Sequence, residues 1–257
     1  MTRFVHPLTL LAVLAVPVAG WFVDDWSGGT TLAVYWFENI ATCLFISLQI
    51  VVHQRWNPRR GHFRYTAPKT GGSRPRTSFV GGFLSTSLAF SAAHGVFLGA
   101  ILFLLDHNGE GDLADVNWRS VGLGCLSVCA LLAFDFVVDL LSLRERSFLQ
   151  IEQTANRALS RVIVVHLTLI FGLFGVAMTG APNALFGVFV VLKALFTLSS
   201  ALPQWEPDAA PAWLSRVMNR VPNVQRGKRF EEVWAADRAD EKARRIRNDQ
   251  PWGGARG

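Results

Sequence analysis

The sequence predicts an all-α, polytopic membrane protein, with a bundle of six transmembrane helices followed by a cytoplasmic amphipathic helical tail. Six apolar stretches fill most of the first 202 residues. Their lengths are close to the ~20 residues that cross ~30 Å of hydrocarbon as a helix. The loops between these stretches alternate in charge. Of the 257 residues, 51% are hydrophobic and 17% are charged, against ~25% charged in an average soluble domain. This composition argues against a soluble enzyme.

The six predicted spans follow one another closely along the chain. They are residues 7–23, 30–52, 78–105, 119–141, 161–179 and 183–202. We expect residues 1–202 to form the transmembrane domain and 203–257 the tail. The first stretch also fits a signal peptide, but the residues near Gly20 make a poor cleavage site. We therefore expect this stretch to be retained as a helix.

The loop charges predict an orientation. The connector 53–77 carries seven basic residues and no acid, which are Arg55, Arg59, Arg60, Arg64, Lys69, Arg74 and Arg76. The turn after the third stretch is acidic, with Asp106, Glu110, Asp112 and Asp115. Basic loops stay in the cytoplasm, so both termini should be cytoplasmic and the protein should lie in the cell inner membrane. The same rule accounts for the net charge of +6, so we expect no nucleic-acid partner. The expected partners are the lipid bilayer and a membrane protein or a second copy.

Polar side chains recur on single faces of the predicted spans. At about 100° per residue, one face of the second span carries Glu38, Thr42, Gln49 and His53, and one face of the third carries Ser87, Ser91 and His94. Asp135 and Asp139 lie in the fourth span, Arg161 and His166 in the fifth, and Lys193 in the sixth. A charge at a helix centre costs roughly 2.5–3.5 kcal/mol on insertion scales. The candidate intramembrane polar site therefore comprises Glu38, Asn39, His94, Asp135, Asp139, Arg161, His166 and Lys193.

The depth of each residue follows from a rise of about 1.5 Å per residue. Glu38 and His94 lie together in the outer half, and the aspartates of the fourth span lie in the inner third, where Arg161 or Lys193 is available to pair with them. Asp139 and Arg161 also fit a structural ion pair or snorkelling near helix ends, and His94 fits an interhelical hydrogen bond. Glu38 lies deeper in an apolar helix, where it needs a partner, a metal ion or a proton.

Three motifs resemble a known family. They are Tyr35-Trp36-Phe37-Glu38-Asn39-Ile40, Ala93-His94-Gly95-Val96-Phe97 and Arg161-Val-Ile-Val-Val-His166-Leu-Thr-Leu-Ile-Phe-Gly172. In order and placement they are similar to domain of unknown function 6498, a bacterial membrane family, over about residues 30–200. The resemblance implies that Glu38, Asn39, His94, Arg161 and His166 are the family-type polar residues, and it implies no activity. The family's His-Tyr-Gly triplet reads Thr86-Ser87-Leu88 here, which puts a two-histidine site on this helix in doubt.

Three classes of function stay open. An accessory or structural subunit comes first, because the chain contains no complete catalytic motif and no intramembrane protease signature. A membrane enzyme is the second class, with a metal or acid–base site on Glu38 and His94. Glu38, His94 and His166 have the ligand types of a zinc or non-haem iron site, although His166 is predicted one to two turns away in depth. A small proton-linked transporter is the third.

The predicted tail has two parts. Apolar residues of 213–221 share one helical face, with Arg216 and Arg220 opposite, so this part should lie flat in the membrane interface. The charged segment 228–248 has a single apolar cluster, of Phe230, Val233 and Trp234. It fits a solvated helix that docks by one end to the loops or to a partner. A partly ordered, merely solubilising tail is the alternative.

Overall fold

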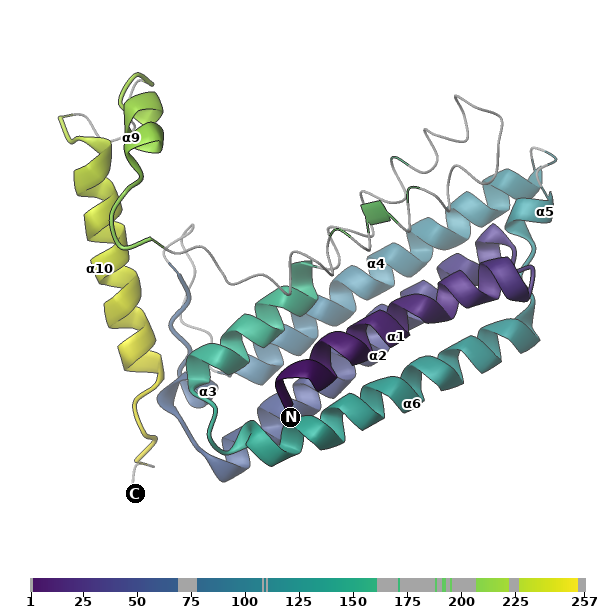
Figure 1. The fold of residues 1–257 in the computed structure, drawn as a ribbon, viewed down its shortest axis with the longest axis horizontal. Helices are drawn as coiled ribbons and strands as arrows, with labels where there is room; N and C mark the ends of the chain where they lie inside the picture. Colours follow the sequence, from purple (N-terminus) through teal and green to yellow (C-terminus); the bar gives the residue numbers. More distant parts are fainter. Residues whose placement is uncertain are drawn as a thin grey trace. The chain divides into compact units, whose positions relative to one another are not determined.

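A computed structural model of the chain describes residues 2–68, 78–107, 109, 111–160, 171, 188, 191–192, 195, 207–221 and 227–253. Its helices are α1 (Thr2–Val23), α2 (Gly28–Trp56), α3 (Arg60–Phe63), α4 (Phe79–His107), α5 (Gly111–Ala114), α6 (Trp118–Leu143), α9 (Ala212–Met218) and α10 (Phe230–Asn248) (Figure 1). Residues 148–160 are also helical. No strand is present in the described part of the chain, so the predicted all-α class is confirmed there.

Three helices are long and apolar enough to cross a membrane. These are α2, α4 and α6, with 29, 29 and 26 residues. They coincide with the second, third and fourth predicted spans. A shorter apolar stretch, Leu11–Val23, lies in α1 where the first span was predicted. The fifth and sixth predicted spans lie outside the described residues, apart from a few single positions, so the count of six stays a prediction.

The chain divides into two compact units. The first, which we call the bundle unit, comprises Met1–Asn57 and Val80–Leu202. The second comprises Pro58–Phe79 and Pro203–Gly257, and we call it the connector–tail unit because it joins the α2–α4 connector to the C-terminal segment. The predicted division of the chain at residue 202 stays a prediction.

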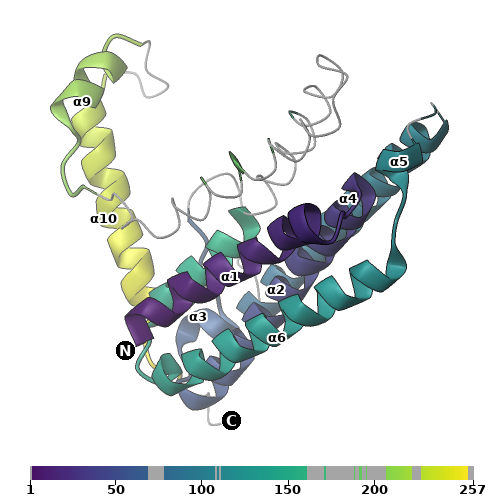
Figure 2. The ribbon, with the colours of Figure 1, turned by 45° about the vertical axis from the view of Figure 1, so that its right-hand side comes forward.

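In the bundle unit, α1, α2 and α6 contact one another (Figure 2). Trp26, in the turn between α1 and α2, forms an apolar cluster with Val34 of α2 and Val128 of α6. A Cβ added at Gly124 of α6 would lie 2.7 Å from Cη2 of Trp26 and 2.9 Å from Cγ2 of Val34, and one at Gly20 of α1 would overlap the same indole ring. Glycine at both positions therefore lets the indole lie directly against two helices.

Hydrogen bonds at both ends fix the directions of α2 and α6. At the first end, the Ser27 hydroxyl accepts from Thr30 N–H at 3.1 Å, and the Thr30 hydroxyl accepts from Asn117 N–H at 2.9 Å. At the other end, the Asn57 amide donates to the carbonyl oxygen of Arg144 at 3.3 Å. The two helices therefore begin at one end and finish at the other, as the predicted second and fourth spans require.

In the connector–tail unit, the end of α9 caps the start of α10. The Asn219 side chain accepts a hydrogen bond from Phe230 N–H at 2.8 Å and donates to the Glu231 carboxylate at 3.2 Å. Hydrogen bonds from the backbone N–H of Glu231 itself and from the Asn219 amide lower the pKa of the Glu231 carboxyl. The segment 228–248 is thus a helix over most of its length, with α9 at one end.

Candidate functional site

One face of α4 is buried along the whole helix. Its members recur every three or four residues and are Phe79, Phe83, Ser87, Ser91, His94, Leu98 and Ile101. The middle of this face is polar and its two ends are apolar. The other faces expose large apolar side chains, such as Val96 at 77% and Phe103 at 69%. A helix that hides serine and histidine and exposes valine and phenylalanine is suited to a lipid environment.

The polar face predicted for α2 is also buried. Glu38 is 2% exposed and His53 is fully covered, and Asn39, Thr42 and Gln49 are buried as well. Burial of five polar side chains on one apolar helix is costly unless each is satisfied. Each of these residues therefore needs a hydrogen-bond partner, in its own helix or in a neighbouring segment.

Trp36 sets the register between α2 and α4. Its indole Nε1–H donates to the carbonyl oxygen of Ser91 at 2.8 Å. A Cβ added at Gly95 would lie only 2.8 Å from Cζ2 of the same ring. Toward the N-terminal end of α2, Leu32 and Tyr35 cluster with Leu98 and Ile101, which lie toward the C-terminal end of α4. The two helices are therefore antiparallel.

This register brings Glu38 and His94 to one level. Glu38 lies two residues beyond Trp36 on α2, and His94 lies one residue before Gly95 on α4, so about 1.5 Å of helix rise separates their levels. His94 is 6% exposed and belongs to the face of α4 that packs on α2. We call the buried polar residues within about two helical turns of this level the polar layer; they are Glu38, Asn39, Thr42, Ser87, Ser91 and His94.

Two side chains of the polar layer bond within their own helices. The Asn39 amide donates to the carbonyl oxygen of Tyr35 at 3.1 Å. The Ser87 hydroxyl donates to the carbonyl oxygen of Phe83 at 2.8 Å. Such bonds to the preceding turn satisfy a donor in an apolar environment without any partner from another helix. The Ser87 hydroxyl and one N–H of the Asn39 amide are thus satisfied within their own helices.

A second polar group lies at the end of the bundle unit where α2 and α6 finish. Asp139 forms a bidentate ion pair with Arg146, in the turn after α6. The Gln49 amide donates to Asp139 Oδ2 at 2.9 Å, and a ring nitrogen of His53 lies 3.0 Å from the carbonyl oxygen of Arg146. The sequence offered Arg161 or Lys193 as the aspartate's partner. Arg146 was missed because it lies beyond the helix end, and only the turn after Leu143 brings it back.

The other predicted site residues have different positions. Asp135 is half-buried on α6. Arg161, His166 and Lys193 lie outside the described residues. Among the residues that are described, no three His, Cys, Asp or Glu side chains form a group suited to a metal ion. The zinc or non-haem iron hypothesis on Glu38, His94 and His166 stays a prediction, because one of its three ligands is outside this part of the chain.

Comparison with known proteins gives one match. A model of a family of unknown function, DUF6498, matches residues 3–218. The chain belongs to this family. No curated protein and no solved structure matches it. The resemblance inferred from the motifs is thereby confirmed. The match covers the bundle helices and α9 and ends before α10.

Two of the DUF6498-like motifs contact each other in the structure. The first contains Trp36 and the second contains Gly95, and these two residues form the close contact between α2 and α4. Sequence reasoning selected Glu38 and His94 from these motifs because ionisable groups stand out in a span. It missed Trp36 and Gly95, although an aromatic residue and a glycine on neighbouring spans are a common packing pair.

Proposed function

We propose that this DUF6498 protein is a six-span protein of the bacterial inner membrane, with both termini in the cytoplasm, and that it acts as an accessory or structural subunit. One observation carries the proposal: Trp36 lies on Gly95 and donates to the Ser91 carbonyl. The first two family-like motifs thus form a helix–helix contact. A packing role accounts for Trp36 and Gly95 without any catalysis.

Purification from native membranes tests this function. An accessory subunit should co-purify with a defined membrane-protein partner at fixed stoichiometry, and Gly95→Ala should weaken that complex by disturbing the α2–α4 contact. Gly99→Ala is the matched control, because no other described part of the chain lies within 4 Å of a Cβ at Gly99. A protein that purifies alone and has its own activity would contradict the proposal.

A second candidate is supported by the polar layer. A carboxylate and an imidazole, Glu38 and His94, are both buried at one level between two apolar helices. Such a pair suits acid–base chemistry, a metal ion or proton-linked transport. Glu38→Gln and Glu38→Ala separate the roles. If Glu38 only makes hydrogen bonds, Gln should preserve stability better than Ala. If its charge is needed, both variants should abolish proton flux in liposomes or lower the metal content on elemental analysis.

The proposed orientation has its own test. In a protein without Cys43, Cys125 and Cys129, a cysteine at Gly109 should react with an impermeant thiol reagent from outside intact cells. Cysteines at Arg60 and Arg144 should react only after the cytoplasmic face is opened. The basis is the alternation of loop charge. Labelling of position 60 from outside would refute the orientation.

The proposed position of α9 is the cytoplasmic membrane interface. Trp213, Val217 and Val221 are exposed at four-residue spacing, and Arg216 and Arg220 are exposed as well. An exposed apolar face with basic neighbours favours anionic lipid surfaces. A spin label at Val217 should be relaxed by lipid-dissolved oxygen, whereas one at Lys242 of α10 should not.

A further inference from the structure

The C-terminal segment covers the backbone of the α2–α4 connector. Arg60 N–H donates to the carbonyl oxygen of Gln250 at 2.8 Å, and Trp252 N–H donates to the carbonyl oxygen of Pro58 at 3.0 Å. Arg59 and Pro251 form an isolated antiparallel bridge between these two bonds. Residues 58–60 thus pair with 250–252 as two short antiparallel strands would.

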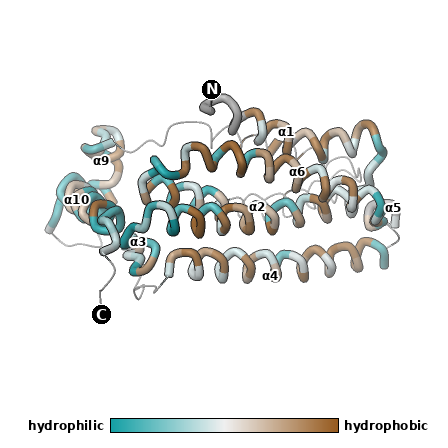
Figure 3. Tube along the Cα trace, turned by 90° about the horizontal axis from the view of Figure 1, so that it is seen from below, coloured by the Kyte–Doolittle hydropathy of each residue, from teal (hydrophilic) through white to brown (hydrophobic). Residues whose placement is uncertain are grey.

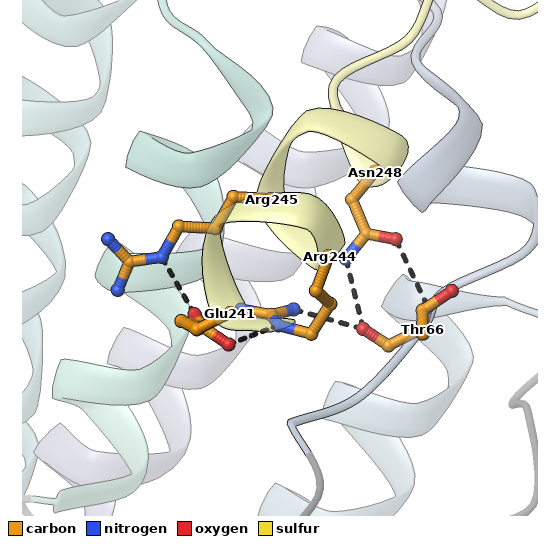
Figure 4. Close-up of polar contacts among 5 residues, drawn as sticks. All are labelled: Thr66, Glu241, Arg244, Arg245 and Asn248. Atoms are coloured by element: carbon orange, nitrogen blue, oxygen red, sulfur yellow. Dashed lines mark hydrogen bonds and ion pairs between the residues drawn. The ribbon is translucent and has the colours of Figure 1, made fainter. Parts of the chain in front are cut away.

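Two side chains of α10 extend this pairing to Thr66 (Figure 4). Asn248 is fully buried, and its amide donates to the Thr66 carbonyl at 3.0 Å while its oxygen accepts from Thr66 N–H at 3.1 Å. Arg244 donates to the same carbonyl at 2.9 Å. Asn248 therefore gives Thr66 both of the bonds that a neighbouring strand would give.

Arg244 is held in place by Glu241. Its Nε and second terminal nitrogen donate to the two Glu241 oxygens at 2.7 and 2.8 Å, and Arg245 donates to the same carboxylate at 2.7 Å (Figure 4). A bidentate pair of this kind fixes the guanidinium plane. The remaining terminal nitrogen is thus aimed at the Thr66 carbonyl.

Aromatic contacts complete the interface. The rings of Phe63 and Trp252 are stacked with centroids 4.9 Å apart. The Arg64 guanidinium lies 5.8 Å from the Trp252 ring centroid, and that of Arg244 lies 6.0 Å from the Tyr65 ring centroid. The connector supplies one ring of the stacked pair and the C-terminal segment supplies the other.

We infer that residues 241–252 are a latch. They bind residues 58–66 of the α2–α4 connector and detach from them as one unit. Most of the contact is polar, and each polar bond replaces a bond to water, so its net contribution is modest. The latch also lies beyond residue 218, where the match to the DUF6498 family ends. The proposed latch segment is therefore outside the part of this chain that matches the family.

The latch bears on the membrane helices through the chain itself. The connector joins α2, which carries Glu38, to α4, which carries His94. A closed connector has less conformational freedom than an open one, so closing the latch restricts the segment that joins α2 to α4. The inference is independent of which proposed function is correct, because it rests on contacts of the connector–tail unit alone.

Amide hydrogen exchange on the intact protein tests the latch. The amides of Arg60, Thr66 and Trp252 all bond across the contact. They should share one protection factor, lower than that of amides in the middle of α2, because a separable unit opens below the global unfolding free energy. Unequal protection of the three, or protection as high as that of α2, would overturn the inference.

Variants supply the second arm of the test. Asn248→Ala should speed exchange at all three amides together by about tenfold, the effect of losing ~1.4 kcal/mol of opening free energy. Arg244→Lys keeps the charge but loses the bidentate fork, and it should act in the same direction with less risk to folding. Arg247→Ala, at an exposed position of the same helix, should leave the three amides unchanged. If Asn248→Ala and Arg244→Lys also leave them unchanged, there is no latch.

Discussion

In the bundle unit, α4 buries Ser87, Ser91 and His94 and exposes Val96 and Phe103. In the connector–tail unit, α10 exposes half of its ten charged side chains and buries Arg244 and Asn248. The hydropathy colouring shows the same contrast, with mainly apolar bundle helices and a mainly polar α10 (Figure 3). The two patterns are those expected of helices in lipid and in water, since lipid favours apolar side chains outside and water favours charged ones.

The two units also hold their elements together differently. In the bundle unit, indole rings lie directly against glycines, as Trp26 does at Gly124 and Trp36 at Gly95. In the connector–tail unit, polar side chains bond to main-chain groups, as Asn248 does to Thr66. Without a hydrophobic effect between helices in lipid, association depends on close packing. In water, small contacts between elements are also stabilised by directed polar bonds. Substitutions that change volume should therefore have their largest effects in the first unit, and changes of pH should act mainly on the second.

The largest effect is expected at Gly124. Its replacement by valine introduces a branched side chain at a position where even a Cβ would lie 2.7 Å from Trp26 and 2.9 Å from Val34. We expect a loss of about 3 kcal/mol, because overpacking forces the indole or α6 to move. Reversible unfolding in mixed micelles measures it. Gly122→Val on the same helix is the control, because among the described residues no atom beyond the local helix backbone lies within 4 Å of a Cβ there. Equal losses at the two positions would contradict a specific role for the contact between Trp26 and Gly124.

A somewhat smaller effect is expected at the ion pair at the end of α6. Asp139→Ala leaves the partly buried Arg146 guanidinium without its carboxylate and the Gln49 amide without its acceptor. The expected loss is about 2 kcal/mol, below the range for fully buried pairs because both side chains keep some contact with solvent. A double-mutant cycle with Arg146→Ala checks it. The two losses should be less than additive, and strict additivity would show that the pair contributes nothing.

The contact between α2 and α4 should be less sensitive than that at Gly124. Gly95→Ala adds one methyl group 2.8 Å from Cζ2 of Trp36, and the partly exposed indole has more room to shift than Trp26 has. We expect a net loss of about 1 kcal/mol, after the helix propensity gained by alanine is subtracted. Gly99→Ala should gain stability by that propensity alone. Replacing Trp36 with phenylalanine should remove the difference between the two alanine variants.

Hydrophobicity and periodicity predicted much of the bundle unit. The span positions of α2, α4 and α6 follow from runs of apolar residues, and the buried faces that contain Glu38 and His94 follow from the cost of polar groups in lipid. Those signals are local to one helix. The Trp26 and Trp36 contacts and the pairing of 58–66 with 244–252 join segments distant in sequence, and the Asp139–Arg146 pair depends on the turn after α6. The sequence predicted that the helix of 228–248 docks by one end to the loops or to a partner. No periodicity marks the residues that form these contacts, so the sequence alone did not predict the contacts themselves.

The smallest effect is expected from pH at the latch. The hydrogen bond from Arg244 lowers the pKa of the Glu241 carboxyl from its ordinary value of 4.5, with a further contribution from Arg245. A carboxyl whose pKa is lower in the folded state stabilises that state above the unfolded value and loses this contribution as the pH falls through the folded value. The latch should therefore be constant in stability from neutral pH down to about 4.5 and should weaken below it. Thr66 amide exchange, corrected for the intrinsic pH dependence, measures this opening. Glu241→Gln should lower protection at neutral pH and abolish the acid dependence, because glutamine cannot titrate. An acid dependence that persists in Glu241→Gln would assign the effect to another group and remove Glu241 from the latch.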